Sequence, residues 1–265
     1  MRERDFIMNL SQNSEILLEV DNISFGYDEK NIISNINLTL KKNELISLLG
    51  VSGSGKSTLF NIIAGLLTPS EGRIIYRGED ITGKSGLISY SFQKDLLLPY
   101  MTIEENVALP LLIKKEKKKE AVKKANEMLK EFKLDAYAKK YPKELSGGMR
   151  QRIALIRTYL FSKDVSLLDE PFSALDAITK DEMHEWYMDM RKKYNMSTIF
   201  ITHDVDEALI LSDRIYILGN GNIKSEIKIK AKNRDNSFKL SQEFLDYKKE
   251  VLKNLENSNK IIAEK

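Results

Sequence analysis

The sequence predicts an α/β fold on the basis of two observations. Between residues 165 and 211, short apolar segments alternate with helical ones, which is the order expected of parallel strands in a layered α/β protein. Earlier in the chain, Ile16 to Tyr27 and Ile36 to Leu40 alternate apolar and polar side chains, which is typical of antiparallel strands. We therefore predict a core with a mixed sheet, preceded by an antiparallel β subdomain.

Turn-forming residues separate the predicted strands. The cluster Asp28 to Asn31 should connect the first two strands, and Gly219 to Gly221 should close a hairpin near the end of the core. The remaining predicted strands are short and apolar, and lie at 44–49, 73–77, 87–92, 165–168, 197–202, 214–218 and 223–229. Outside the central region, helices are predicted after residue 56, through 183–190, over 205–211 and, in a polar tail, over 241–255.

The central part of the sequence has helical periodicity. Thr102 and Glu105 have the spacing of a capping box, in which each side chain accepts a hydrogen bond from the other residue's backbone N–H. A helix is predicted to continue from Lys114 to Leu134, with its apolar residues on one face. The charged run at 114–120 fits either a solvated helix face or a basic patch for phospholipid or nucleic acid.

Composition excludes several classes of protein. The chain has 265 residues, a formal net charge of +3 and no cysteine, so disulfides and cysteine-ligated metal centres are excluded and no nucleic-acid partner is required. No apolar run has the length of a membrane span, and the first six residues lack the apolar core of a signal peptide. We therefore expect a soluble, cytoplasmic protein.

A phosphate-binding pattern follows the strand at 44–49. Gly50 to Ser57 match G-x-x-x-x-G-K-[ST] where a strand gives way to a helix, so successive backbone N–H groups and the helix N-terminus can hold polyphosphate oxygens. Lys56 is expected to neutralise the β- and γ-phosphates, and Ser57 to ligate Mg²⁺. The predicted nucleotide-binding residues of this loop are Gly50, Val51, Ser52, Gly53, Ser54, Gly55, Lys56, Ser57 and Thr58.

Two carboxylates follow the predicted strand at 165–168. In a triphosphatase, a carboxylate at such a strand end can hold the magnesium shell, and its neighbour can polarise the attacking water. Asp169 and Glu170 fit these two roles in that order. Together with the glycine loop they predict a P-loop NTPase core.

A third motif makes the prediction specific. The segment Leu145 to Arg152 resembles the signature motif of ATP-binding-cassette (ABC) ATPases, and it lies between the two nucleotide motifs. Other family motifs follow the expected order, and the resemblance covers about residues 16–229. These other motifs are the adenine-side aromatic Tyr27, the glutamine-loop Gln93, the loop Ser173 to Asp176 and the switch histidine in Thr202 to Asp204.

The resemblance implies a domain organisation and a role for each of the motif residues. It implies an ABC ATPase domain over 1–229 that binds ATP and Mg²⁺, a helical subdomain at about 94–160 carrying the signature, and a short tail over 230–265. Two copies would form a head-to-tail dimer in which the signature of one copy completes the site of the other. The implied roles are a catalytic base for Glu170, water and γ-phosphate contacts for His203, water and metal sensing for Gln93, a metal ligand for Asp169, base stacking for Tyr27, γ-phosphate binding for Ser146, Gly147 and Gly148, and a link across the dimer for Asp176.

One signature residue departs from the broader family pattern. Met149 stands where Gln is common, and a thioether cannot make the hydrogen bonds of an amide, so contacts to the nucleotide sugar are left open. The phosphate-binding backbone amides do not depend on this side chain.

The segment at 96–111 resembles the importer subfamily for nitrate, sulfonate and taurine. Tyr100 takes the place of a Trp that is frequent there, and the resemblance implies that Leu98, Pro99 and Tyr100 contact a membrane permease subunit. An ATPase at the cytoplasmic face of the membrane is therefore expected, in a system with an external solute-binding protein. Two alternatives remain: the ATPase of an exporter or lipoprotein-release system, and a soluble ABC ATPase acting on nucleic acid or ribosomes.

Overall fold

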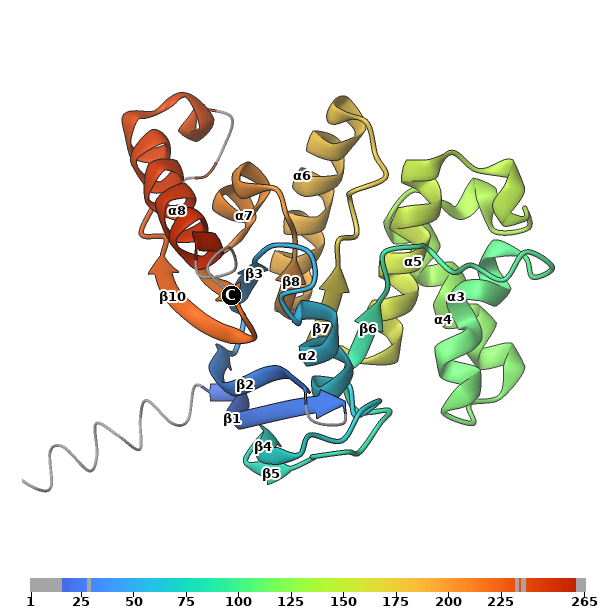
Figure 1. Ribbon diagram of the computed structural model, residues 1–265. Coiled ribbons are helices and arrows are strands. Elements are labelled where there is room, and N and C mark those ends of the chain that lie inside the picture. Colours follow the sequence, from blue (N-terminus) through green and yellow to red (C-terminus); the bar gives the residue numbers. More distant parts are fainter. Residues whose placement is uncertain (1–15, 28–29, 232–233, 235–236, 261–265) are drawn as a thin grey trace, which may run out of the picture. The chain divides into compact units, whose positions relative to one another are not determined.

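The computed structural model describes residues 16–27, 30–231, 234 and 237–260. The chain divides into two compact units. The first contains residues up to 87 and from 195 onward, and the second contains residues 88–194 (Figure 1). Part of the predicted turn at Asp28 to Asn31 lies outside the described residues, as does the first part of the chain, where a signal peptide was not expected.

The first unit begins with the predicted antiparallel β subdomain. Its strand order is β2-β1-β4-β5. The strands are β1 (Ile16–Tyr27), β2 (Lys30–Lys41), β4 (Glu71–Tyr76) and β5 (Glu79–Asp80). Alternate residues of β1, including Leu18 and Val20, are buried, so the sequence alternation corresponds to one buried face.

The mixed sheet of the first unit carries the glycine loop. Strands β9, β3 and β8 are parallel neighbours, and β10 pairs antiparallel with β9. Their bounds are β3 (Leu45–Leu49), β8 (Ser197–Ile201), β9 (Arg214–Gly219) and β10 (Asn222–Lys228). Every residue of β3 and β8 is buried, which explains why both are mostly apolar and show no alternation with exposed polar residues. Helices α2 (Lys56–Ile63) and α7 (Val205–Leu211) follow β3 and β8, respectively.

The C-terminal tail packs into the first unit. It contains a short 3₁₀ turn, η3 (Phe238–Leu240), and the helix α8 (Gln242–Lys260), which lies beside α7 in Figure 1. Phe244 and Val251 of α8 are buried in one hydrophobic cluster with Leu209 of α7. The helix is longer than the predicted 241–255, and its apolar face covers α7 and the β9–β10 hairpin.

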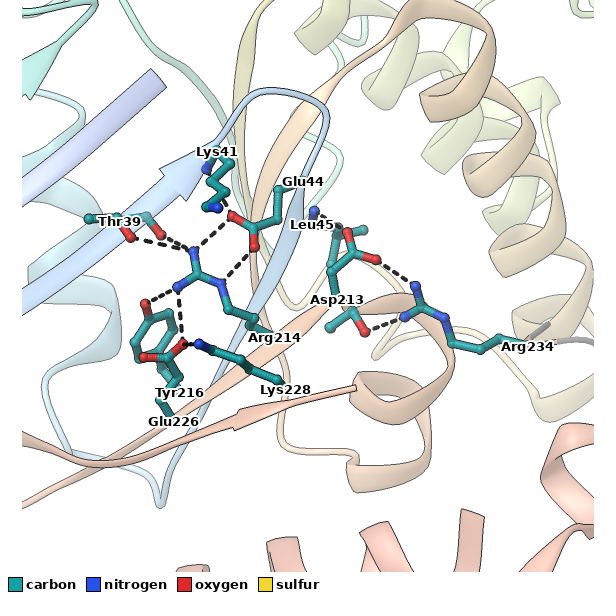
Figure 2. A network of polar contacts seen from close by, with 11 residues as sticks. Thr39, Lys41, Glu44, Leu45, Asp213, Arg214, Tyr216, Glu226, Lys228 and Arg234 are labelled. Carbon is teal, nitrogen blue, oxygen red and sulfur yellow. Dashed lines mark hydrogen bonds and ion pairs between the residues drawn. The ribbon is translucent and has the colours of Figure 1, made fainter. Parts of the chain in front are cut away.

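A polar network fixes β9 and the start of the tail (Figure 2). The Arg214 guanidinium donates to both carboxylate oxygens of Glu44, at 2.6 and 2.8 Å, and also to the Tyr216 hydroxyl and to Glu226. Next to it, Arg234 forms an ion pair with Asp213 at 2.5 Å. Arg234 belongs to the tail, so this second pair anchors the tail at the beginning of β9.

The second unit combines two parallel strands with helices (Figure 1). Its elements are β6 (Ser89–Ser91), α3 (Ile103–Ile113), α4 (Lys118–Glu131), η1 (Asp135–Tyr137), η2 (Pro142–Glu144), α5 (Gly147–Phe161), β7 (Val165–Asp169) and α6 (Ala177–Tyr194). The capping box of Thr102 and Glu105 is present at the start of α3, as predicted. None of the helices in the described part of the chain is both long and apolar enough to span a membrane.

The predicted continuous helix from Lys114 to Leu134 is wrong at its beginning. Lys115 has a left-handed backbone (φ 65°), and the N–H groups of Lys115 and Glu116 donate to carbonyls in the last turn of α3. This is a helix C-terminal cap, and α4 begins only at Lys118. The charged run has no apolar residue to bury, so the chain turns there and α4 packs back on α3.

Candidate nucleotide-binding and hydrolysis site

The glycine loop joins β3 to α2 in a conformation that requires its glycines. Gly53 and Gly55 have φ values of 77° and 100°, and Gly55 caps the N-terminus of α2. A Cβ atom on Gly55 would lie 2.3 Å from the Ile33 side chain, and one on Gly50 would lie 2.3 Å from the Leu218 carbonyl oxygen. Both the backbone conformation and the close packing therefore favour glycine at the predicted positions.

Lys56 is the first residue of α2, and its ammonium group lies over the loop. Its Nζ donates to the carbonyl oxygens of Gly50 at 2.7 Å and Val51 at 2.9 Å, and the residue is only 8% exposed. The positive charge thus lies at a helix N-terminus, where the backbone N–H groups also favour anions. Ser57, the predicted magnesium ligand, is exposed in the first turn of the same helix.

In the second unit, the structure brings Gln93 and Glu170 together. The Gln93 side-chain amide donates to Glu170 at 3.3 Å and to the Ser173 hydroxyl at 3.4 Å. Glu170 has a left-handed backbone with φ 46°, a conformation that costs a non-glycine residue about 1–2 kcal/mol. This strain falls on the residue that the sequence analysis assigned as the base, which is a common property of functional sites.

Asp169, at the end of β7, has a hydrogen-bond donor that the sequence analysis missed. The Tyr90 hydroxyl lies 3.3 Å from Asp169 Oδ2, and burial, together with this carboxylate, raises the pKa of Tyr90. The phenol therefore keeps its proton and donates to Asp169 across the physiological pH range. The contact depends on the parallel pairing of β6 with β7, which places Tyr90 opposite Leu167. A tyrosine in the predicted strand at 87–92 was the only signal available in the sequence.

The signature residues occupy the N-terminus of α5. Ser146 is the N-cap, and its hydroxyl accepts a hydrogen bond from the Met149 N–H at 3.3 Å. Gly147 is exposed, while a Cβ on Gly148 would lie 2.8 Å from a side-chain carbon of Thr179. The exposed first turn can present backbone N–H groups to an anion, as the resemblance implied.

His203 lies in the first unit, two residues after the end of β8. It is exposed, whereas Thr202 before it is buried, and Asp204 after it caps α7 by accepting the N–H groups of Asp206 and Glu207. His203 is therefore exposed near the end of β8, between a buried Thr202 and an Asp204 that caps α7.

Residues 33–173, more than half of the sequence, match the ABC transporter family. The chain belongs to this family. The ABC ATPase is 44% identical to the formylaminopyrimidine import ATP-binding protein ThiZ of Halalkalibacterium halodurans, over 77% of this chain and 80% of that protein. It is 42% identical to the aliphatic sulfonates import ATP-binding protein SsuB of Bacillus cereus, over 85% of this chain and 88% of that protein.

Solved structures agree with the fold of the ABC ATPase. A dimeric ATP-binding cassette, solved in a post-hydrolysis state with ADP and Pi, has a TM-score of 0.69 at 31% identity and covers 81% of this chain and 100% of that one. The predicted α/β fold and the resemblance to ABC ATPases are therefore confirmed. The protein is an ATP-binding, transport-coupled ATPase.

Two predicted nucleotide residues of the ABC ATPase are strongly exposed within their own units. Tyr27 is 58% exposed and touches Phe25 edge-on at 5.1 Å between ring centroids. Asp176 is exposed and accepts hydrogen bonds from the backbone and hydroxyl of Thr179, which lower its pKa. Asp176 therefore stays ionised and, in this structure, caps the start of α6.

The predicted permease-contact segment has a rigid base and an exposed tip. Tyr100 is 81% exposed. The fully buried Asn106 accepts a hydrogen bond from the Leu98 N–H at 2.7 Å and donates to the carbonyl oxygens of Leu98 and Met101 at 3.1 Å. This amide holds the turn from both sides, so the exposed aromatic ring is presented by a fixed backbone.

Two arginines of α5, also missed in the sequence analysis, bind the segment between Gln93 and this turn. Arg150 Nε donates to Asp95 at 3.1 Å, and Arg157 donates to the backbone carbonyl oxygens of Asp95 at 2.5 Å and Leu96 at 2.8 Å. The helix that begins with the signature is thereby tied to the segment after Gln93 within one unit. Arginine has several donors in a fixed geometry, which suits it to such bridging.

Proposed function

We propose that this ABC ATPase energises a membrane importer for a small solute of the sulfonate, nitrate or taurine class. The observation that carries the proposal is its similarity, over 77% and 85% of the chain, to proteins named as import ATP-binding proteins. The exposed Tyr100 turn, with its fixed base, supports contact with a membrane permease. The proposed system also contains an external solute-binding protein, and the chain acts at the cytoplasmic face of the membrane.

The proposed reaction is hydrolysis of ATP at two sites in a head-to-tail dimer. Lys56 and the N–H groups of the glycine loop bind the β- and γ-phosphates, and Tyr27 stacks on the base. Ser146, Gly147 and Gly148 of a second copy bind the γ-phosphate from the other side. The support for this step is the exposed N-terminus of α5 and the dimeric state of the similar solved cassette.

Glu170 is the proposed base. Its carboxylate accepts the proton of the attacking water, while Gln93 and His203 orient that water and the γ-phosphate. Mg²⁺, when bound, neutralises phosphate charge, and the oxygen donors of Ser57, Gln93 and Asp169 are of the kind that this ion prefers. The Gln93–Glu170 hydrogen bond supports a link between the permease-contact segment and the base.

The phenol of Tyr90 is expected to orient the Asp169 carboxylate toward the metal. Because a single hydrogen bond contributes about 0.5–1.5 kcal/mol, Tyr90→Phe should raise the Mg²⁺ concentration for half-maximal hydrolysis by roughly two- to tenfold. The measurement is a Mg²⁺ titration of the ATPase rate at saturating ATP. Tyr159→Phe, which removes a buried phenol on α5, is the matched control and should leave the titration unchanged. An unchanged Mg²⁺ requirement in Tyr90→Phe would remove Tyr90 from this role.

The proposed transport role is tested by identifying the membrane partner. The tagged chain, purified from native membranes, should bring with it a protein that has several membrane spans, and Tyr100→Lys should reduce that recovery without weakening ATP binding. A strain without the chain should lose uptake of radiolabelled taurine, an alkanesulfonate or nitrate. Recovery with ribosomes or DNA would instead support the soluble alternative. Unchanged uptake with loss of an efflux activity would support the exporter.

A further inference from the structure

Glu207 is a buried carboxylate that the proposed reaction does not use. It lies on the first turn of α7, four residues after His203, and is 4% exposed. Its carboxylate accepts a short hydrogen bond from the hydroxyl of Thr202, which is 2% exposed. Burying a carboxyl group costs free energy unless its oxygens are hydrogen-bonded, and Thr202 supplies one such hydrogen bond here.

The Thr202 hydroxyl links the segment that contains His203, residues 202–204, to Glu207 of α7. A hydroxyl has one proton to donate and two lone pairs that accept. Thr202 gives its proton to Glu207 and accepts the Asp204 N–H at 3.0 Å. Asp204 in turn accepts the N–H of Glu207 at 3.2 Å. These bonds form a closed ring that joins the two residues on either side of the exposed His203 to α7, and the acceptor at Glu207 fixes which way the Thr202 hydroxyl points.

The ring includes Glu207 of α7, and α7 is held in place by its packing against α8. Ala208 and Leu209 of α7 are fully buried in the cluster that includes Phe244 and Val251 of α8. On the surface, Lys248 of α8 forms an ion pair with Asp206 at 2.6 Å. Because packed interiors resist displacement, an anchor on α7 holds the loop in one place.

We infer that Glu207 and Thr202 are positioning residues that set the backbone, and so the imidazole, of His203 for contact with the γ-phosphate and the attacking water. The inference rests on the proposed role of His203 in hydrolysis. The hydroxyl–carboxylate pair of Thr202 and Glu207 sets the orientation of His203, which the end of β8 alone does not fix.

Matched substitutions separate positioning from folding. Thr202→Val keeps the shape and removes the hydroxyl, whereas Thr202→Ser keeps the hydroxyl. Glu207→Leu removes the acceptor, whereas Glu207→Gln retains an oxygen that accepts the same bond. Thr158→Val is the control for the chemistry of the change, because Thr158 is also buried and its hydroxyl donates only to the helix carbonyl of Ala154 at 2.8 Å.

The expected result is a loss of turnover without a loss of binding. Because a misplaced catalytic group can reduce rates by about 100-fold, kcat of the full chain should fall roughly 10- to 100-fold in Thr202→Val and Glu207→Leu. KM and the affinity for a fluorescent ATP analogue should stay within about twofold, since only transition-state contacts are lost. Thr202→Ser, Glu207→Gln and Thr158→Val should retain most of the rate, and thermal unfolding of each variant reports its folding.

A double-variant cycle gives the decisive readout. In a His203→Ala background, Thr202→Val should cause no further loss, because both changes remove the same contribution. An additional loss equal to that seen in the wild-type background overturns the inference, as does a Thr202→Val enzyme that turns over normally while His203→Ala is impaired; both leave the proposed function intact. Normal turnover in both His203→Ala and Glu170→Gln contradicts the proposed hydrolytic site itself and removes the inference with it.

Discussion

Replacing Glu170 by Gln is expected to reduce steady ATP turnover by about 10²- to 10⁴-fold, the usual contribution of a general base. ATP binding should persist, because the amide has nearly the shape of the carboxylate and its oxygen can still accept the hydrogen bond from Gln93. The variant should therefore accumulate as an ATP-bound dimer. The measurements are phosphate release, equilibrium binding of a fluorescent ATP analogue, and gel filtration with and without Mg²⁺-ATP.

Lys56→Ala provides the contrasting variant for this experiment. Its ammonium lies over the glycine loop, so its loss should weaken nucleotide binding itself and prevent ATP-dependent dimerisation. The two variants thus separate binding from hydrolysis. Hydrolysis near the wild-type rate in Glu170→Gln would remove Glu170 as the base, and ATP binding as tight as wild type in Lys56→Ala would remove Lys56 as a phosphate ligand.

The motifs could be predicted from the sequence where a local backbone conformation requires a particular residue type. Gly55 must adopt a φ of 100° at the start of α2, and Ser146 caps α5 with its own hydroxyl, so both motifs carry their structural reason within a few residues. The strands β3 and β8 were predictable for a related reason. A strand buried on both faces has no solvent-exposed positions, so it is mostly apolar and can be identified without knowledge of its neighbours.

Contacts between distant segments could not be predicted in the same way. Tyr90 and Asp169 are 79 positions apart in the chain, and the Tyr90 hydroxyl reaches Asp169 only because β6 pairs with β7. Arg150 likewise meets Asp95 across 55 positions. Tyr90 has no local pattern that distinguishes it from other tyrosines, and the signature motif that contains Arg150 does not identify Asp95 as its partner. The end of α3 was also missed, because Lys115 adopts a left-handed backbone that is usually marked by glycine.

The largest expected effect on stability comes from another contact of this kind, between Arg214 and Glu44 (Figure 2). Each side chain is 11% exposed, and 170 positions separate them in the chain. Removing one member of a largely buried ion pair leaves the Glu44 carboxylate without its guanidinium partner, so Arg214→Met should lower the free energy of unfolding by about 3–5 kcal/mol. Urea denaturation followed by circular dichroism measures this change. Arg73→Met, which removes the exposed pair with Asp21, is the control and should alter the midpoint little.

The double variant Glu44→Leu with Arg214→Met tests the physical reason for this effect. If the cost comes from the uncompensated carboxylate, removing both charges should recover most of the lost stability, because an apolar pair of similar volume can replace a buried ion pair. Arg214 also donates to the Thr39 carbonyl oxygen at 2.6 Å, to the Tyr216 hydroxyl at 2.7 Å and to Glu226 at 3.1 Å. A double variant that remains as unstable as Arg214→Met would therefore show that these other contacts of Arg214, of which the Thr39 bond joins β9 to β2, carry the stabilisation, and that the ion pair with Glu44 adds little to it.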